Sequence, residues 1–341
     1  MKIHKKVGFA VVGLGSIAQT SVLPAFRRCK KAQLVALVSR DKKKATRVAR
    51  EFRATAAYDQ NEFGECLANP DVEAVYVATP QGEHARFAIE ASLAGKHVLC
   101  EKPLAATVEQ SRWIVDACRA NDVLLMTAYR KYFEPSTVFL KNLIHRGALG
   151  HIDMIHTAFS ELHEPGKSLE WLLDAKLAGG GPLMDLGIYC VNTSRWLVNE
   201  DPVTVSAETW KQDVRRFREV EQGIAFRMHF PSGLVVQGSA SYGAAMSSFI
   251  HVQGTMGWVS ITPVFDFSQA RELTGNVKGR RIAKRFTITD EFAPEIDAFA
   301  SAIRTGSKVE PDGAQGHRDM IILHSIYESA KNQGPVTVRY Q

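Results

Sequence analysis

The feature that most constrains the fold is a short apolar run that ends in a glycine-rich turn. Residues 7–12 are Val, Gly, Phe, Ala, Val and Val, and Gly13-Leu14-Gly15-Ser16-Ile17-Ala18 follows them directly. A continuous apolar run of this length predicts a strand buried on both faces. The turn matches the G-x-G-x-x-G/A pattern, in which glycines make a tight turn and let the backbone approach a pyrophosphate. The pattern therefore predicts a dinucleotide site, with Gly13, Gly15, Ser16 and Ile17 at the phosphates.

The rest of the chain shows two different patterns of predicted secondary structure. Apolar runs at residues 34–38, 72–78, 97–100 and 123–126 alternate with helical patterns at 59–68, 83–94 and 108–120. Strands separated by helices of this length indicate βαβ units and a parallel sheet. After residue 129 come helical patterns at 135–145, 183–197, 293–304 and 315–332, with alternating stretches between 203 and 261. We expect an NAD(P)-binding Rossmann domain over residues 1–128 and a second domain over 129–341, with an antiparallel sheet and a polar loop at 265–284.

Composition argues against several other classes of protein. The 42 Lys and Arg residues are nearly balanced by 36 Asp and Glu residues, giving a net charge of +6. No nucleic-acid recognition motif is visible beside this near-balance of charge, so nucleic acid is not an expected partner. No apolar run reaches the ~20 residues that span a bilayer. The five cysteines are dispersed and odd in number, which favours free thiols, no metal site and a cytoplasmic location.

The residues after the second apolar run bear on the choice of dinucleotide. NAD sites usually place an acidic residue there to hold the ribose 2′-hydroxyl. This chain has Ser39-Arg40 instead, with Lys44 close behind. A hydroxyl, a guanidinium and an ammonium favour a 2′-phosphate, which a carboxylate would repel. The sequence favours NADP, although Asp41 leaves NAD open as a ribose-binding alternative.

Reactive side chains follow the later strands. Thr79-Pro80 ends the run at 72–78, and His84 lies shortly after it. Glu101-Lys102-Pro103 ends the run at 97–100, where ligands of open α/β sheets bind. Further along, Gly180-Gly181-Pro182-Leu183-Met184-Asp185-Leu186-Gly187-Ile188-Tyr189 opens a helix. Asp185 and Tyr189 are four residues apart, so we expect them on one helical face.

Together these segments resemble the Gfo/Idh/MocA oxidoreductases, especially the branch that oxidises sugars and dihydrodiols. The resemblance covers nearly the whole chain, from the Gly13 turn to Ile326-Tyr327-Glu328-Ser329. It implies a Rossmann domain followed by an α/β domain with a large, open-faced, mainly antiparallel sheet. It also implies hydride transfer between nicotinamide and a hydroxyl or carbonyl of a sugar-like substrate, in a homodimer or homotetramer. Leu172 departs from the arginine that relatives often carry there, which leaves the particular substrate open.

The resemblance also assigns roles to individual residues. Lys102 is implied as the catalytic lysine, while Asp185 and Tyr189 bind the substrate and move its proton; the reverse assignment, with Lys102 as the base, stays open. The implied cofactor contacts are Gly13, Gly15, Ser16, Ile17, Ser39, Arg40, Lys44, Thr79, Pro80, His84, Glu101, Lys102 and Tyr129. The implied substrate contacts are Lys102, Tyr129, His163, Asp185 and Tyr189.

Two other functions fit the same fold. One is a nucleotide-sensing regulatory protein without catalysis, which the joint presence of Lys102, Asp185 and Tyr189 disfavours. The other is an NAD(P)-dependent glycosidase, in which the hydride leaves and returns while a glycosidic bond breaks.

Overall fold

The computed structural model describes residues 5–164, 166 and 169–340, and it separates into two compact units. The first comprises residues 1–130 and 290–317, and the second comprises 131–289 and 318–341. We expected from the sequence that everything after residue 128 would lie in the second domain. Residues 290–317 instead return to the first unit, where their helix packs on the parallel sheet.

The first unit is built on a parallel sheet. Its strands are β1 (Val7–Val12), β2 (Ala32–Ser39), β3 (Ala56–Asp59), β4 (Ala74–Val77), β5 (His97–Glu101) and β6 (Leu125–Ala128). They are hydrogen-bonded in the order β3-β2-β1-β4-β5-β6. This order changes direction between β1 and β4, which is the switch point at which doubly wound sheets bind ligands.

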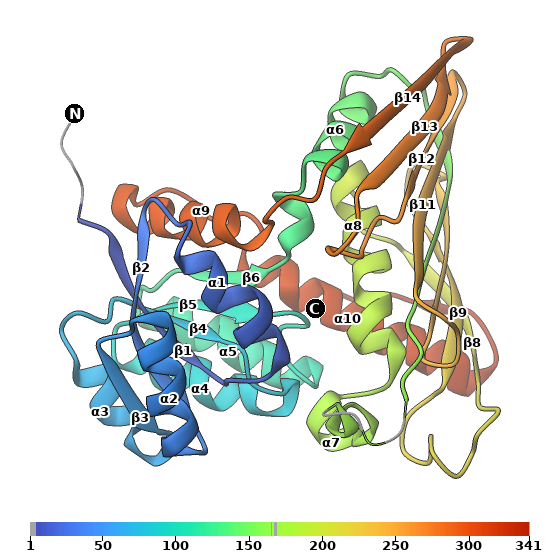
Figure 1. Cartoon of the computed structure of the whole chain (residues 1–341). Coiled ribbons are helices and arrows are strands. Elements are labelled where there is room, and N and C mark those ends of the chain that lie inside the picture. Colours follow the sequence, from blue (N-terminus) through green and yellow to red (C-terminus); the bar gives the residue numbers. More distant parts are fainter. Residues whose placement is uncertain (1–4, 165, 167–168, 341) are drawn as a thin grey trace. The chain divides into compact units, whose positions relative to one another are not determined.

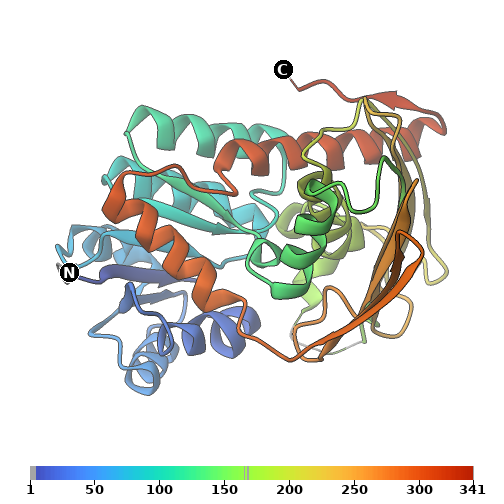
Figure 2. The ribbon, with the colours of Figure 1, turned by 90° about the horizontal axis from the view of Figure 1, so that it is seen from above.

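Helices lie on both faces of this sheet. They are η1 (Ala18–Val22), α1 (Leu23–Phe26), α2 (Lys42–Phe52), η2 (Gln60–Glu62), α3 (Phe63–Ala68), α4 (Gln81–Leu93), α5 (Val108–Ala120) and α9 (Phe292–Thr305). Figures 1 and 2 show α1 and α9 on one face, with α4 and α5 on the other. Pro24 stands in the first turn of α1, a position that suits the missing N–H and fixed φ of proline.

Helix α9 explains why the chain returns to the first unit. The ring of Phe299 packs edge-on against Phe9 of β1, with 6.3 Å between ring centroids. The Asp297 carboxylate accepts hydrogen bonds from the backbone N–H groups of Lys30 and Lys31, each at 2.8 Å. These contacts join segments more than 260 residues apart, so no local pattern could reveal them.

The second unit is built on a larger sheet. Its strands are β7 (Ile152–Ser160), β8 (Thr204–Trp210), β9 (Gly223–His229), β10 (Val235–Ser241), β11 (Ser247–Gly254), β12 (Gly257–Thr262), β13 (Arg271–Val277), β14 (Arg280–Phe286) and β15 (Val336–Thr337). Their order is β14-β13-β12-β11-β7-β10-β9-β8-β15, and among the pairings given for this sheet only that of β7 with β10 is parallel. The sheet is therefore mainly antiparallel.

Helical elements of the second unit cover one face of its sheet. They are α6 (Pro135–His145), η4 (Glu170–Leu173), α7 (Ala175–Ala178), η5 (Leu183–Gly187) and α8 (Ile188–Val198), together with η3 (Arg130–Tyr132) and α10 (Gly313–Asn332), which cross the boundary between the units. Strand residues alternate between buried and partly exposed, as in β7 and β11. The opposite face carries no helix in the described part of the chain (Figure 1). The predicted fold class, a Rossmann sheet followed by an open-faced, mainly antiparallel one, is confirmed.

The prediction of a loop at 265–284 was wrong for most of that stretch. Residues 271–277 and 280–286 form the hairpin β13–β14, which turns at Lys278 and Gly279 with positive φ at both. In β13, Arg271, Leu273 and Gly275 are buried while Glu272 and Thr274 are exposed. The stretch is rich in polar residues because one face of the hairpin is exposed to solvent. Buried and exposed residues alternate along β13, and the overall polarity of the stretch hid this alternation in the sequence.

Two further findings concern the chain as a whole. All five cysteines are buried and unpaired, as their spacing predicted. Within the residues that the structure describes, no helix is both long and apolar enough to span a membrane.

Candidate active site

The turn after β1 has room for only a glycine at its first position. Gly13 has φ +92°, and a Cβ atom there would lie 2.5 Å from the carbonyl oxygen of Ala78 and 2.7 Å from the nitrogen of Thr79. At Gly15, by contrast, a Cβ atom would meet nothing within 4 Å. The first glycine thus lets β1 approach the end of β4, and the second leaves open space in front of the backbone. Ser16 is exposed and Ile17 half-buried beside that space.

The end of β2 holds the residues predicted for the ribose. Ser39 is half-buried and its Oγ accepts a hydrogen bond from the backbone N–H of Asp41 at 3.3 Å. The Asp41 carboxylate caps α2, accepting from the N–H of Lys44 at 3.0 Å. Arg40 is exposed. The Asp41 carboxylate is therefore used to cap α2. The exposed charged side chain beside it at the end of β2 is that of Arg40, which is cationic.

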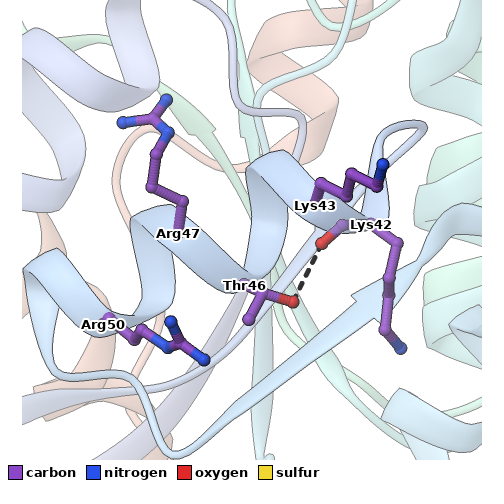
Figure 3. Close-up of a pocket in the computed structure, with 5 residues that line it drawn as sticks. All are labelled: Lys42, Lys43, Thr46, Arg47 and Arg50. Carbon is purple, nitrogen blue, oxygen red and sulfur yellow. Dashed lines mark hydrogen bonds between the residues drawn. The ribbon is translucent and has the colours of Figure 1, made fainter.

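Helix α2 continues this positive charge along its outer face. Lys42, Lys43, Thr46, Arg47 and Arg50 line an open hollow of about 460 Å³ (Figure 3). Lys42 pairs with Glu62, and Arg47 lies 3.8 Å from a carboxylate oxygen of Glu51. The hollow does not include Ser39, Arg40 or Lys44, so it extends beyond the predicted ribose contacts.

His84 lies between the segment that follows β4 and the segment that follows β5, which contains Lys102. Its Nε2 lies 2.9 Å from the carbonyl oxygen of Thr79, and its Nδ1 lies 3.1 and 3.3 Å from those of Pro103 and Leu104. Burial lowers the pKa of His84 to about 4, so the ring is neutral at neutral pH. Since the side chain is only 1% exposed, His84 braces the backbone around Lys102 rather than presenting a face to solvent.

Two buried polar groups mark the same edge of the sheet. The Oγ1 of Thr79 and the Oε1 of Gln81 are buried without a hydrogen-bond partner among the described residues. Buried hydroxyl and amide groups are normally paired, so unpaired ones at strand ends indicate a place for a polar ligand. Together with the open space at Gly15, they fit a dinucleotide lying across the β1 and β4 ends.

Lys102 follows β5 directly, on a segment that Glu101 holds. The Glu101 carboxylate accepts from the Tyr76 hydroxyl at 2.8 Å and from the backbone N–H of Lys102 at 3.2 Å. Burial raises the pKa of Glu101, while the nearby Lys102 opposes that shift. Lys102 itself is half-buried, and Tyr129, just after β6, is almost fully buried. Pro80 precedes α4 as its N-cap residue.

In the second unit, Asp185 and Tyr189 begin one continuous helical segment, as predicted. Asp185 lies in the π-helical turn η5 and Tyr189 in the first turn of α8. The ring of Tyr189 packs against Phe159 and Phe265, with centroid distances of 5.8 and 5.5 Å. The phenol is therefore held between aromatic side chains of this unit and is 9% exposed.

Asp185 has a partner that the sequence did not reveal. The Tyr242 hydroxyl donates to its Oδ2 at 3.1 Å, although the two residues are 57 positions apart. Burial and the adjacent Asp185 charge raise the pKa of Tyr242 well above its ordinary value. Tyr242 therefore stays a hydrogen-bond donor and orients the carboxylate.

His163 lies beside Tyr242, with 5.4 Å between ring centroids. Its Nδ1 is 2.8 Å from a guanidinium nitrogen of Arg216, and its Nε2 is 3.1 Å from the carbonyl oxygen of Leu169. A guanidinium only donates and a carbonyl only accepts, so Nδ1 accepts and Nε2 carries the proton. Both ring nitrogens are thus engaged by the protein, and His163 supports Tyr242 rather than offering a nitrogen to a ligand.

A buried glutamate fixes the glycine-rich turn that precedes Asp185. The Glu221 carboxylate accepts from the N–H groups of Gly181 and Leu183, each at 3.0 Å, and from the Tyr327 hydroxyl at 2.8 Å. A Cβ atom on Gly180 would lie 2.1 Å from that hydroxyl, and one on Gly181 would lie 2.5 Å from the Glu221 carbonyl oxygen. This packing explains both the run of glycines and the distant Tyr327. Glu221 itself carried no signal in the sequence.

The structure thus gathers the predicted residues into two groups. The first unit holds Gly13, Thr79, His84, Glu101 and Lys102 along adjoining strand ends. The second holds Asp185 and His163 beside Tyr242, and Tyr189 between Phe159 and Phe265. Among the described residues, no group of three or more His, Cys, Asp or Glu side chains is arranged to hold a metal ion.

Comparison with known proteins accounts for both units. Residues 7–129 match the model of an oxidoreductase family with an NAD-binding Rossmann fold. Residues 137–260 match the GFO/IDH/MocA C-terminal domain. The two matches lie in the two units and follow one another in the predicted order.

Individual relatives extend over nearly the full chain. D-Xylose 1-dehydrogenase [NADP(+)] of Haloarcula marismortui is 33% identical, covering 97% of this chain and 92% of that protein. Trans-1,2-dihydrobenzene-1,2-diol dehydrogenase of Oryctolagus cuniculus is 33% identical over 72% of this chain and 73% of its own length. The crystal structure of aldose–aldose oxidoreductase from Caulobacter crescentus, complexed with glycerol, has a TM-score of 0.92 and 33% identity, covering 98% of this chain and all of that one. The chain belongs to the Gfo/Idh/MocA family of oxidoreductases, and its amino-terminal part is that family's NAD-binding Rossmann fold.

Proposed function

We propose that the protein is an NADP-dependent oxidoreductase that moves hydride between the nicotinamide and a hydroxyl or carbonyl of a sugar-like substrate. The observation that carries the proposal is the turn after β1, where Gly13 fits against Ala78 and Gly15 faces open space. The names of the relatives agree, since one is an NADP-dependent D-xylose dehydrogenase and another an aldose–aldose oxidoreductase.

The first unit supplies the cofactor contacts in this proposal. Gly13, Gly15, Ser16 and Ile17 would hold the pyrophosphate, and Thr79 and Pro80 would lie along the dinucleotide at the end of β4. When bound, the cofactor supplies a nicotinamide ring that accepts or returns hydride. His84 and Glu101 keep the backbone of Lys102 in place beside that ring.

Specificity for the 2′-phosphate is expected to depend on Arg40. Removing the guanidinium with Arg40→Ala should weaken NADP binding roughly ten- to a hundred-fold and leave NAD binding nearly unchanged, because a charge-assisted contact to phosphate is worth about 1.5–3 kcal/mol. Ser39→Asp should shift preference toward NAD by placing a carboxylate at the same corner. Fluorescence titration of both cofactors measures these constants. Tighter binding of NAD than of NADP by the unmodified protein would refute the preference.

Oxidation of a carbinol carbon requires that the hydroxyl proton leave as the hydride leaves. In the proposal Tyr189 takes that proton, Lys102 stabilises the developing negative charge, and Asp185, held by Tyr242, orients the hydroxyl.

The substrate class can be tested directly. Aldoses, anhydrosugars, inositols and dihydrodiols would be screened for NADP reduction by the absorbance of the reduced nicotinamide. Net NADPH formation with one of them supports the dehydrogenase. Release of free sugar without net NADPH would instead support the glycosidase alternative, and neither product would favour the regulatory one.

The open face of the second unit is expected to mediate self-association. Phe249 of β11 and Trp258 of β12 lie on this face, 36% and 39% exposed, with the His251 ring packed on Trp258. Exposed apolar patches of this kind mark contact surfaces. We expect a homodimer or homotetramer in sedimentation equilibrium at micromolar concentration, and dissociation by Phe249→Glu with Trp258→Glu. The control is Trp113→Glu on α5, an exposed tryptophan of the other unit. A monomeric wild type would contradict the expectation.

The five unpaired cysteines also support placing the protein in the cytoplasm, where thiols stay reduced.

A further inference from the structure

Helix α9 buries a carboxyl group for which the proposed reaction has no use. Glu295 is 0% exposed, and neither of its carboxyl oxygens has a hydrogen-bond partner among the described residues. An ionised carboxylate in such surroundings is strongly disfavoured unless something pairs with it. Burial accordingly raises the pKa of Glu295 well above its ordinary value, and the negative charge of Glu101 adds to the effect. Burial raises the pKa of both carboxyl groups, but the hydrogen bonds that Glu101 accepts from Tyr76 and from the N–H of Lys102 favour its ionised form, whereas Glu295 accepts none among the described residues.

Glu291 and Glu295 are four residues apart at the start of α9, so they lie on the same side of the helix. Glu291 pairs with Arg130, which stands two residues after Ala128, the register partner of Glu101 at the end of β5. The charges of Glu101, Arg130, Glu291 and Asp290 all act on Glu295. Arg130 forms a buried ion pair with Glu291 at 2.5 Å. Asp290 accepts from Arg28 at 2.6 Å, toward the surface.

The cations of this cluster already have carboxylates beside them. Arg130 forms an ion pair with Glu291, and Lys102 is the cation with the largest effect on the pKa of Glu101. Glu295 is a third buried carboxyl with no cation of its own. Ionising it would leave one uncompensated negative charge behind the strand end that carries Lys102.

Glutamine would fill the same volume without the free-energy cost of an uncompensated negative charge. A buried group that destabilises the fold and serves no local contact is typical of a functional position. The carboxyl differs from the amide in having a proton that can leave, and the negative charge left behind would act on the charged groups around Glu295, among them Glu101 and Arg130.

We propose that Glu295 is a proton-holding residue beside the end of β5, which releases its proton when the oxidised, positively charged nicotinamide binds at that strand end and keeps it when the reduced, neutral ring binds. This rests on the proposed function. The physical reason is that a positive charge arriving in a poorly solvated region favours the carboxylate over the acid. Only the O–H bond of Glu295 breaks, and its proton goes to the buffer. Glu295 touches no reacting atom in this proposal and is a positioning residue.

The first test needs no cofactor. In the unfolded chain Glu295 titrates near its ordinary value of about 4.3, whereas in the folded protein it keeps its proton to higher pH. Folding stability therefore falls as pH rises from about 4.3 to the folded value, because the unfolded state gains by ionising. Glu295→Gln should remove this loss and raise Tm by about 3 °C at pH 7, with no difference from wild type near pH 4. Glu65→Gln, at an exposed site on α3, is the control and should show no rise at pH 7.

The second test measures protons. Isothermal titration of NADP and of NADPH in buffers of different ionisation enthalpy gives the number of protons released on binding. Wild type should release up to one more proton with NADP than with NADPH at pH 7–8, and Glu295→Gln should abolish the difference. NADP affinity should also rise with pH in wild type relative to the variant, about tenfold for each pKa unit of coupling.

The outcomes separate the two proposals. A Glu295→Gln protein that is less stable than wild type at pH 7, or does not fold, would show that Glu295 is ionised and would overturn the inference. An equal proton difference in wild type and variant would overturn the coupling while leaving cofactor binding in place. If wild type binds neither nucleotide, the proposed function fails and the coupling with it, and the stability comparison still decides the protonation of Glu295.

Discussion

Replacing Tyr189 with phenylalanine should lower kcat roughly 10²- to 10⁴-fold while NADP affinity stays within about twofold. The ring stays packed between Phe159 and Phe265, so the substitution removes the hydroxyl and leaves the packing. Loss of a proton carrier slows the chemical step without touching the dinucleotide turn of the other unit. Steady-state kinetics with the substrate found in the screen, together with cofactor titration, separate the two effects.

The control for this variant is Tyr340→Phe. The Tyr340 hydroxyl donates to the carbonyl oxygen of Pro202 at 2.7 Å. The control substitution therefore removes a tyrosine hydroxyl from the same unit without changing the proposed substrate contacts. We expect kcat to be unchanged. If Tyr189→Phe kept near-full kcat and an unchanged pH profile while Lys102→Ala were inactive, Lys102 would be the base and the assignment of Tyr189 would be wrong.

Gly13→Ala should mainly lower the stability of the fold, whereas Gly15→Ala should mainly weaken NADP binding. Gly13→Ala forces a positive φ on a residue with a side chain and drives its Cβ into the backbone of residues 78–79, so we expect a loss of about 2–5 kcal/mol in the free energy of unfolding. Gly15→Ala meets nothing in the protein, so stability should change by less than about 1 kcal/mol. NADP binding should nevertheless weaken roughly tenfold or more, because the methyl group enters the space left for the pyrophosphate.

Denaturant unfolding and NADP titration of the same two variants give both quantities. The pair is informative because the chemical change is identical and only the surroundings differ. Unimpaired NADP binding by Gly15→Ala would mean that the open space is not the pyrophosphate site. A Gly13→Ala protein as stable as wild type would mean that β1 does not approach β4 as closely as described.

Local patterns were sufficient for the first sheet and for the residues at its strand ends. The runs that predicted five of its strands consist of apolar residues buried on both faces, and that burial is recorded in each segment by itself. β3 was missed because its residues are half-buried and mixed in character. The hairpin β13–β14 was mistaken for a loop because only alternate residues are buried in β13, and only Phe286 is buried in the largely charged β14.

The supporting residues were beyond any local pattern. Tyr242 acquires its importance from Asp185, and Glu221 from Gly181 and Leu183, through hydrogen bonds spanning 57, 40 and 38 positions. Such partners are selected by the register of the second sheet, which brings the end of β10 beside η5. A glutamate or tyrosine in a strand-rich stretch looks the same in the sequence whether it braces a site or faces solvent.

The sequence by itself determined five strands of the Rossmann sheet, the glycine-rich turn after β1 and the candidate reactive groups, because each of these is a pattern within about a dozen neighbouring residues. Only the tertiary structure decided that α9 returns to the first unit, that His163 has both nitrogens engaged, and that the carboxyl oxygens of Glu295 are buried with no hydrogen-bond partner among the described residues. Burial and pairing depend on which distant segments come to lie around a side chain. A glutamate on the exposed face of a helix is solvated and ionised, whereas one on a buried face without a partner favours its protonated form. Only the packing around the side chain distinguishes the two cases.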